Sequence, residues 1–171
     1  MRTIQLVAVS ATLMALTLTG CSTADITASD AVSPAQSRLS KSKGVERPWK
    51  GDCIVYAQIT SATTLTFAGT CQLAHMGRTS VVAYQTITAV PSGFTFTNTA
   101  TYTAANGDEL HTITTDGTAT PSATGLTLAG TETAVGGTGR FVNARGTATM
   151  TGTVRFDTGI GAYRLDGRLT Y

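Results

Sequence analysis

The sequence predicts an all-β protein, an eight-stranded antiparallel up-and-down β-barrel. From Cys53 to Tyr171, apolar residues alternate with threonine at a period of two, as half-buried strands require. Turn signals containing Gly, Pro or Asn divide this region into short runs. No segment has a convincing amphipathic helical period. Short connections between successive strands favour a barrel, and a β-sandwich is the alternative.

Eight strands are expected, in chain order, at 53–60, 64–75, 79–89, 93–105, 108–115, 124–134, 146–156 and 161–171. The fourth is the clearest, because Phe94, Phe96 and every second residue to Ala104 alternate with threonines. Threonine opposite the aromatic residues suits a solvated face and disfavours an outer-membrane barrel, which needs an apolar outer band. The interior of an eight-stranded barrel is filled by side chains or holds one small ligand.

The first two strands have a predictable register. A three-residue loop, Ser61 to Thr63, pairs Ile59 with Leu65 and places Cys53 opposite Cys71. Directly opposed cysteines can form a cross-strand disulfide in an oxidising compartment.

The fourth and fifth strands are expected to meet at a two-residue turn, Asn106-Gly107. That turn pairs Ala105 with Asp108 and, further along, Tyr102 with His111. His111 is therefore expected on the apolar face that also carries Tyr102 and Phe96.

The N-terminus predicts export. Residues 1–20 combine an early cation with an apolar run too short for an ordinary spanning helix, which is typical of a signal peptide. Leu18-Thr19-Gly20-Cys21 resembles a bacterial lipoprotein processing site, so Cys21 is expected to carry the lipid. A plain signal peptide with an incidental cysteine is the alternative. Lipidation at Cys21 would anchor the protein on the extracytoplasmic side of the bacterial cell envelope, as its membrane contact.

Removal of 20 residues from 171 leaves 151, enough for one domain and a tether. Residues 21–50 indicate the tether and residues 51–171 the barrel. The basic residues of the tether would favour anionic head groups or simply keep a linker soluble. Without Arg2, 11 basic residues face 10 acidic ones, a net charge of +1 that gives no case for a nucleic-acid partner.

Several polar residues fall on the predicted apolar face. Glu132 alternates in phase with Leu126 and Leu128, so an unbroken strand points it inward, whereas a bulge after Gly130 would turn it outward. A buried charge is paired, neutralised or functional. The catalytic candidates are Glu132, His111 and Tyr102, and the in-phase ligand-binding candidates are Asn98 and Phe96. His75 is in phase with the second strand but lies beside a turn, which favours solvation.

The run VGGTGRFVNARG, residues 135–146, lacks a nucleotide-binding signature. Val142 stands where a dinucleotide fingerprint needs its third glycine, and no lysine followed by Ser or Thr closes a phosphate loop. The run is better interpreted as a corner pinned by Phe141. No His, Cys and Asp spacing suggests a metal site, and no cofactor is expected.

The same run resembles the Gly-Gly-Thr-Gly-x-Phe-x-x-Ala-Arg-Gly signature of plant dirigent proteins and of the wider allene oxide cyclase-like barrels. The resemblance implies a calycin-like barrel with a central cavity, and in dirigent proteins, often trimers, that cavity steers phenoxy-radical coupling without a bound cofactor. It makes a homo-oligomer an expectation to test. Arg145 matches the motif arginine as a ligand-binding candidate, or else bonds backbone carbonyls at a corner.

Three functions are compatible with these observations. The leading one is an envelope-anchored lipoprotein whose barrel binds a small hydrophobic, aromatic or phenolic molecule. The second is a cofactor-free isomerase or cyclase of the allene oxide cyclase or dirigent kind. The third is a structural or adhesive surface protein, which predicts a barrel packed shut with side chains.

Overall fold

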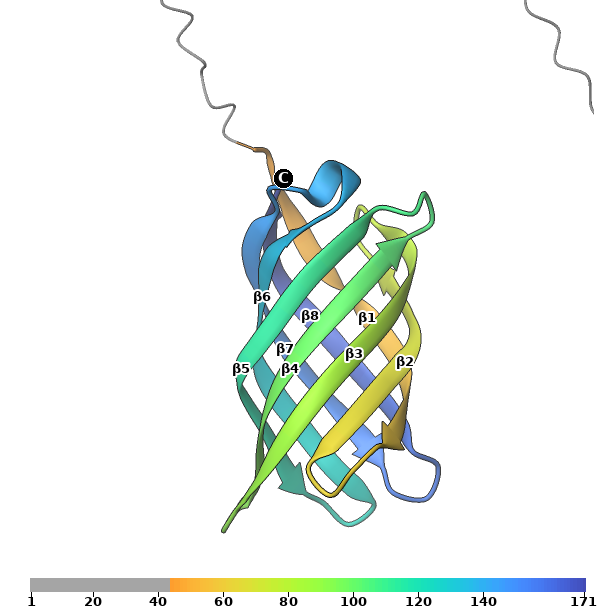
Figure 1. The fold of residues 1–171 in the computed structure, drawn as a ribbon, viewed down its shortest axis with the longest axis vertical. Coiled ribbons are helices and arrows are strands. Elements are labelled where there is room, and N and C mark those ends of the chain that lie inside the picture. The colour runs from red at the N-terminus through yellow and green to blue at the C-terminus, as the bar shows by residue number, and fades with distance from the viewer. Residues whose placement is uncertain (1–43) are drawn as a thin grey trace, which may run out of the picture. The chain divides into compact units, whose positions relative to one another are not determined.

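The computed structural model describes residues 44–171 (Figure 1). Eight antiparallel strands, each paired with its sequence neighbours, close into a barrel through pairing of the first with the last. The fold class is therefore confirmed. The elements are β1 (Glu46–Ile59), β2 (Thr64–Leu73), β3 (Gly77–Val90), β4 (Gly93–Ala104), β5 (Glu109–Pro121), β6 (Gly125–Gly137), the 3₁₀ turn η1 (Gly139–Phe141), β7 (Arg145–Arg155) and β8 (Ile160–Thr170).

Sequence-based boundaries differ most at the first strand. β1 begins at Glu46, whereas the alternation predicted a start at Cys53. The added residues pair with the end of β8, and Trp49 is fully buried at the barrel's end. The signal peptide, Cys21 with its lipid, and most of the predicted tether lie outside the described residues. Within residues 44–171, no helix is long and apolar enough to cross a membrane.

The register of the first hairpin is confirmed. Ile59 pairs with Leu65, and Cys53 with Cys71, with Cα atoms 4.0 Å apart in a disulfide. Both cysteines are buried on the inner face.

The register of the β4–β5 hairpin was predicted wrongly by one residue. Tyr102 pairs with Leu110, and His111 with Thr101, because the loop has three residues, with Gly107 at φ +86°. This loop puts Leu110 into the core with no exposed surface and turns His111 outward. A one-residue slip exchanges the two faces of a strand, and burial of leucine is less costly than burial of histidine.

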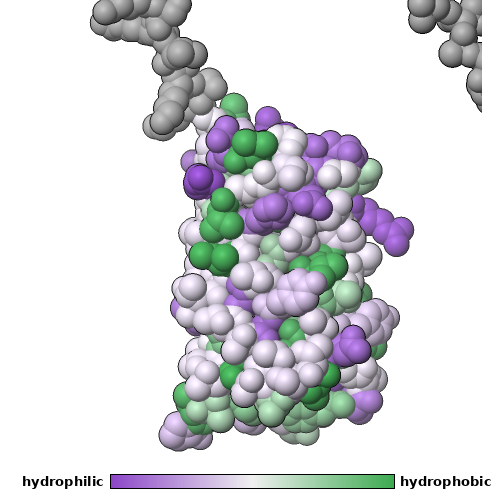
Figure 2. All heavy atoms as spheres, viewed as in Figure 1, coloured by the Kyte–Doolittle hydropathy of each residue, from purple (hydrophilic) through white to green (hydrophobic). Residues whose placement is uncertain are grey.

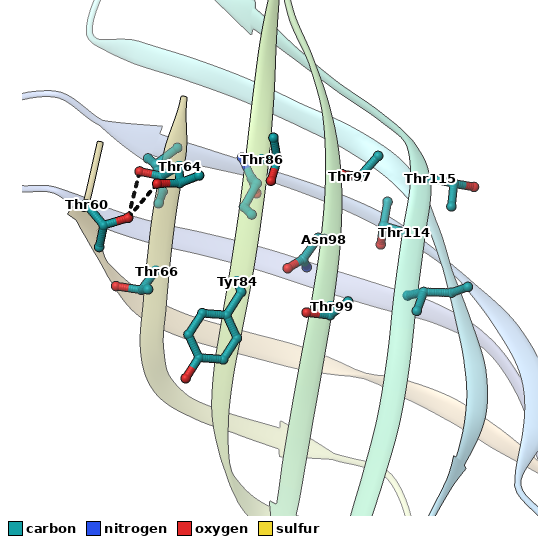
Figure 3. A pocket seen from close by; sticks show the side chains of 13 residues that line it. Thr60, Thr64, Thr66, Tyr84, Thr86, Thr97, Asn98, Thr99, Thr114 and Thr115 are labelled. Carbon is teal, nitrogen blue, oxygen red and sulfur yellow. Dashed lines mark hydrogen bonds between the residues drawn. The ribbon is translucent and has the colours of Figure 1, made fainter. Parts of the chain in front are cut away.

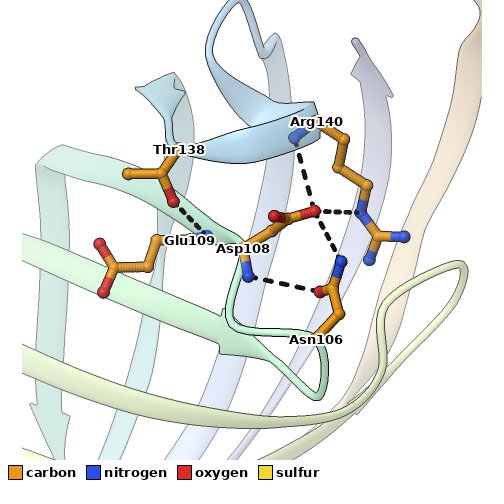
Figure 4. A network of polar contacts seen from close by, with 5 residues as sticks. All are labelled: Asn106, Asp108, Glu109, Thr138 and Arg140. Carbon is orange, nitrogen blue, oxygen red and sulfur yellow. Dashed lines mark hydrogen bonds and ion pairs between the residues drawn. The ribbon is translucent and has the colours of Figure 1, made fainter. Parts of the chain in front are cut away.

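One end of the barrel is closed by the glycine-rich corner. Phe141, in η1, is fully buried and packs edge to face against Tyr171, with ring centroids 4.8 Å apart. The corner is clasped to the β4–β5 turn (Figure 4). There the Asp108 carboxylate accepts hydrogen bonds from the Asn106 side chain, at 2.8 Å, and from the Arg140 backbone N–H, at 3.4 Å. The corner interpretation of this run is confirmed.

Candidate functional site

A buried carboxyl group lies in the middle of the barrel. Glu132 is 1% exposed, and both of its carboxylate oxygens accept hydrogen bonds from the Tyr102 hydroxyl, at 2.8 and 2.9 Å. Thr112 Oγ1 donates a further bond to Oε2 at 3.3 Å. The Tyr102 hydroxyl is also 3.1 Å from that of Tyr163, which in turn is 3.9 Å from Cys71 Sγ of the disulfide. One polar chain therefore runs across the interior from β6 to β2.

Strand register holds Glu132 inward. β6 pairs with β7 without interruption from Gly125 to Ala134, so the bulge that would have turned Glu132 outward is absent from that strand pair. The pairing of β6 with β5 has two irregularities: one adds Val135 to β6, beyond Glu132, and the other lies in β5, between Thr114 and Thr118. There Asp116 accepts a hydrogen bond from the Thr131 backbone N–H at 2.8 Å, which secures the bulge on the outer side. The unbroken-strand prediction for Glu132 is confirmed.

Burial shifts the pKa values of the side chains in this hydrogen-bonded row. Desolvation raises the pKa of Glu132 to about 7, although the hydrogen bonds from Tyr102 and Thr112 act to lower it. Desolvation, reinforced by the nearby Glu132 charge, raises the pKa of Tyr102 and of Tyr163 above that of an ordinary tyrosine. Near neutral pH both phenols are therefore protonated, while Glu132 exists in both forms. A carboxyl group with this pKa can give or take a proton at physiological pH.

Two adjoining cavities lead from these polar side chains to the end of the barrel opposite the corner. The mouth cavity, of about 260 Å³, opens between the β1–β2 and β7–β8 ends and has a mainly apolar lining that includes Ile59, Ile87, Phe94, Leu126 and Phe156. The neck cavity, of about 30 Å³, lies deeper and reaches Glu132 and Tyr163. The two share four lining residues: Phe67, Gln85, Leu128 and Val154.

No family model, curated protein or solved structure matches the chain.

A larger hollow, of about 590 Å³, lies on the outer face over β2 to β5 (Figure 3). Its outward side chains are mostly threonines with Tyr84, and this face is largely pale in the hydropathy view (Figure 2). At its edge the hydroxyls of Thr60 and Thr64, 2.8 Å apart, form a hydrogen bond with each other. The hollow is open to water and holds no buried ionisable group, so the interior is the stronger candidate site.

The structure brings together some of the predicted site residues. Glu132 and Tyr102 are in direct contact, and Asn98 lines the neck. Phe96 is buried in the core one inward position nearer the mouth, but it lines neither cavity. In the part of the chain that the structure describes, no group of three His, Cys, Asp or Glu side chains is placed to hold a metal ion.

Two predicted site residues lie elsewhere. His111 is on the outer face, with Nε2 3.2 Å from Glu109 Oε2, as a consequence of the three-residue turn. Arg145 is exposed at the corner and donates a hydrogen bond to the Ala144 carbonyl at 2.6 Å, as its corner interpretation predicted. Neither side chain lines the mouth or the neck. His75 is exposed in the β2–β3 turn with φ +62°.

Sequence reasoning missed Tyr163 and Gln85. Tyr163 alternates in phase with Leu165 and Leu169 on β8, and Gln85 with Val81 and Ala83 on β3. Period-two phasing would have found both, since each is a polar residue on the inner face of a strand.

Proposed function

We propose that this chain is an envelope-anchored lipoprotein whose barrel binds one small apolar or aromatic molecule through the open end. The observation that carries the proposal is the mouth cavity, which is lined mainly by apolar side chains and continues toward a few convergent polar groups. That combination is typical of small-molecule sites. Its volume of about 260 Å³ favours a ligand of one ring or a short chain. Anchoring would come from Cys21, on the sequence signal alone.

The third function predicted from the sequence, a structural or adhesive protein, calls for a filled barrel. Side chains fill the corner end, where Trp49, Phe141, Leu110 and Leu165 are almost completely buried. The mouth end is hollow, which supports the binding proposal instead.

The test is thermal unfolding of the full chain with a panel of monocyclic aromatic and short aliphatic ligands. A bound ligand stabilises the folded chain by RT ln(1 + [L]/Kd), so the Tm rises with the logarithm of the ligand concentration once that concentration exceeds Kd. Leu128→Trp, which places a larger side chain where the two cavities meet, is expected to abolish the shift, measured against its own ligand-free Tm. Thr97→Trp, on the outer face, is the matched control and should retain it. If no ligand in the panel shifts the Tm, the proposal is wrong.

A second candidate function is a cofactor-free isomerase or cyclase of the allene oxide cyclase or dirigent kind. The contact between Glu132 and Tyr102 favours it, because a carboxyl with a pKa near 7 beside a protonated phenol can act as an acid–base pair. A ligand in the neck would lie against Glu132, which lines that cavity. Turnover of a candidate substrate should then fall by 10²-fold or more in Glu132→Gln. Unchanged turnover in both Glu132→Gln and Tyr102→Phe would exclude it.

A further inference from the structure

Two acceptor groups of the neck have room for further hydrogen bonds. A carboxylate can accept about four hydrogen bonds, and Glu132 receives two donated hydrogens, one from the Tyr102 hydroxyl, shared between its two oxygens, and one from Thr112. Asn98 Oδ1 is buried without a hydrogen-bond partner. Both residues line the same small cavity. A ligand group that donates several hydrogen bonds would satisfy both.

Within residues 44–171, no cationic side chain lines the neck. The titratable groups that face Glu132 are Tyr102 from β4 and Tyr163 from β8, and the inward positions of β5 and β7 beside it are Thr114 and Ala148. Arg155, at the rim of the mouth, is exposed and bonded to Asp157. A buried carboxylate is costly unless a positive charge accompanies it.

The cavity narrows inward from an apolar mouth to the neck that contains these two acceptors. Leu128 borders both parts, and Glu132 lies four residues further along β6, roughly 13 Å along the strand at about 3.3 Å per residue. A neck of about 30 Å³ has room for a group the size of one or two water molecules. An ammonium group on a short chain has that size, offers three donors and carries the missing charge.

We infer that the ligand is a small arylalkylamine, with its ring in the mouth cavity and its ammonium group in the neck, bonded to Glu132 and Asn98 Oδ1. This inference rests on the proposed binding function and narrows the ligand to one chemical class. Carboxylic acids of the same shape should bind more weakly, because ionised Glu132 repels them and no cationic side chain lines the neck.

Protonation of Glu132 gives the inference a second, independent readout. With a pKa of about 7, Glu132 is largely protonated in the free barrel at pH 5.5 and largely ionised at pH 7.5. An ammonium ion selects the ionised form, so its binding releases a proton at the lower pH. The affinity should rise on the order of 20-fold between these two values, while the amine itself, with a pKa of about 10, stays charged.

The experiment is calorimetric titration of the full chain at pH 7.5 with four probes that share a phenylpropyl body. These are 3-phenylpropylamine, 3-phenylpropan-1-ol, butylbenzene and 4-phenylbutanoate. We expect the amine to bind at least tenfold more tightly than the alcohol or the hydrocarbon, and the carboxylate most weakly. Glu132→Gln should remove the preference for the amine while butylbenzene still binds. Glu109→Gln, which removes an exposed carboxylate on the outer face, is the matched control and should keep it.

The outcomes separate the two proposals. If the alcohol or the hydrocarbon binds as tightly as the amine, the amine inference is wrong and the binding function stands. If none of the four binds, both are wrong. Should Glu132→Gln fail to fold, proton release is measured on the unaltered chain at pH 5.5 in two buffers of different ionisation enthalpy. Amine binding without proton release there overturns the inference.

Discussion

The Tyr102 hydroxyl bonds to both carboxylate oxygens of Glu132, at 2.8 and 2.9 Å, inside a barrel whose outer face carries a row of threonines along β4. The two residues belong to β4 and β6, which are separated by β5, so the bond spans the curvature of the wall. Such a contact ties two non-adjacent strands through the most polar point of the core. Because Glu132 is buried only in the folded barrel, its protonation is coupled to the stability of the fold.

Stability should therefore fall as pH rises from about 4.5 to about 7. Folded Glu132 keeps its proton up to a pKa of about 7, whereas the ordinary value is 4.5, so over this interval the unfolded chain holds fewer protons than the folded one. The stabilisation is complete below pH 4.5 and is lost as pH approaches 7, by roughly 3 kcal/mol. Urea unfolding across this range should show the slope in the wild type and a much flatter one in Glu132→Gln. Equal slopes would contradict the assignment.

Tyr102→Phe should destabilise the barrel by about 1–3 kcal/mol, since it leaves the buried carboxyl without its main donor. Loss of those bonds should also raise the pKa of Glu132 further. Tyr163→Phe removes a hydroxyl that has no direct hydrogen bond to Glu132, so it is the control and should cost less. Chemical denaturation at pH 6 measures both free energies of unfolding, and an equal loss in the two variants would argue against a special role for Tyr102.

The disulfide should contribute about 3 kcal/mol, because it closes a loop between residues 18 apart in sequence. Cys53→Ala with Cys71→Ala is expected to lower the free energy of unfolding by that amount. Adding a dithiol to the wild-type chain should produce a similar loss, whereas the double variant should not respond. Denaturant midpoints with and without reductant provide the comparison.

Gly139→Ala should be markedly more damaging than Gly107→Ala. Both glycines have positive φ, +52° and +86°, but a Cβ at Gly139 would overlap the Asp108 carboxylate, whereas one at Gly107 meets open space. Gly107→Ala therefore reports the backbone strain alone, about 1–2 kcal/mol. Gly139→Ala adds disruption of the clasp at the corner. Thermal unfolding of the two variants measures the difference. An equal loss of Tm in both would mean that the contacts of Asp108 with the corner contribute little to stability.

The sequence predicts the inward face correctly where a strand has a long alternating pattern, and less well where the face depends on a single turn. Threonine occupies every second position of β4 from Thr95 to Thr103, and Glu132 is in phase with Leu128 on β6. This period placed Glu132 and Tyr102 on the inner face. His111 was misplaced because its face depended on one turn. Asn106-Gly107 is compatible with loops of two or three residues, and contacts from Asp108 to the distant η1 accompany the longer loop. Long-range contacts of this kind carry no local pattern.

The same limit applies to Tyr163. Its phase on β8 is readable, but its proximity to Tyr102 arises only when β8 closes against β1 and carries its inner face to the centre. The direction of the cavity was equally hidden, since nothing local to the loops indicates which end of a barrel is plugged. Phe141 gave the only hint, as the one large apolar residue in the glycine-rich corner.

Pairing of Glu46 with Thr170 brings the start of β1 and the end of β8 together at the plugged end, beside the C-terminus (Figure 1). Ile59, at the end of β1, and Phe156, directly after β7, line the mouth at the opposite end of the barrel. A fluorophore, an affinity handle or a sensor surface attached at Tyr171 would thus leave the route to Glu132 unobstructed. The plugged end is therefore the suitable point of attachment, because the mouth stays open to solvent.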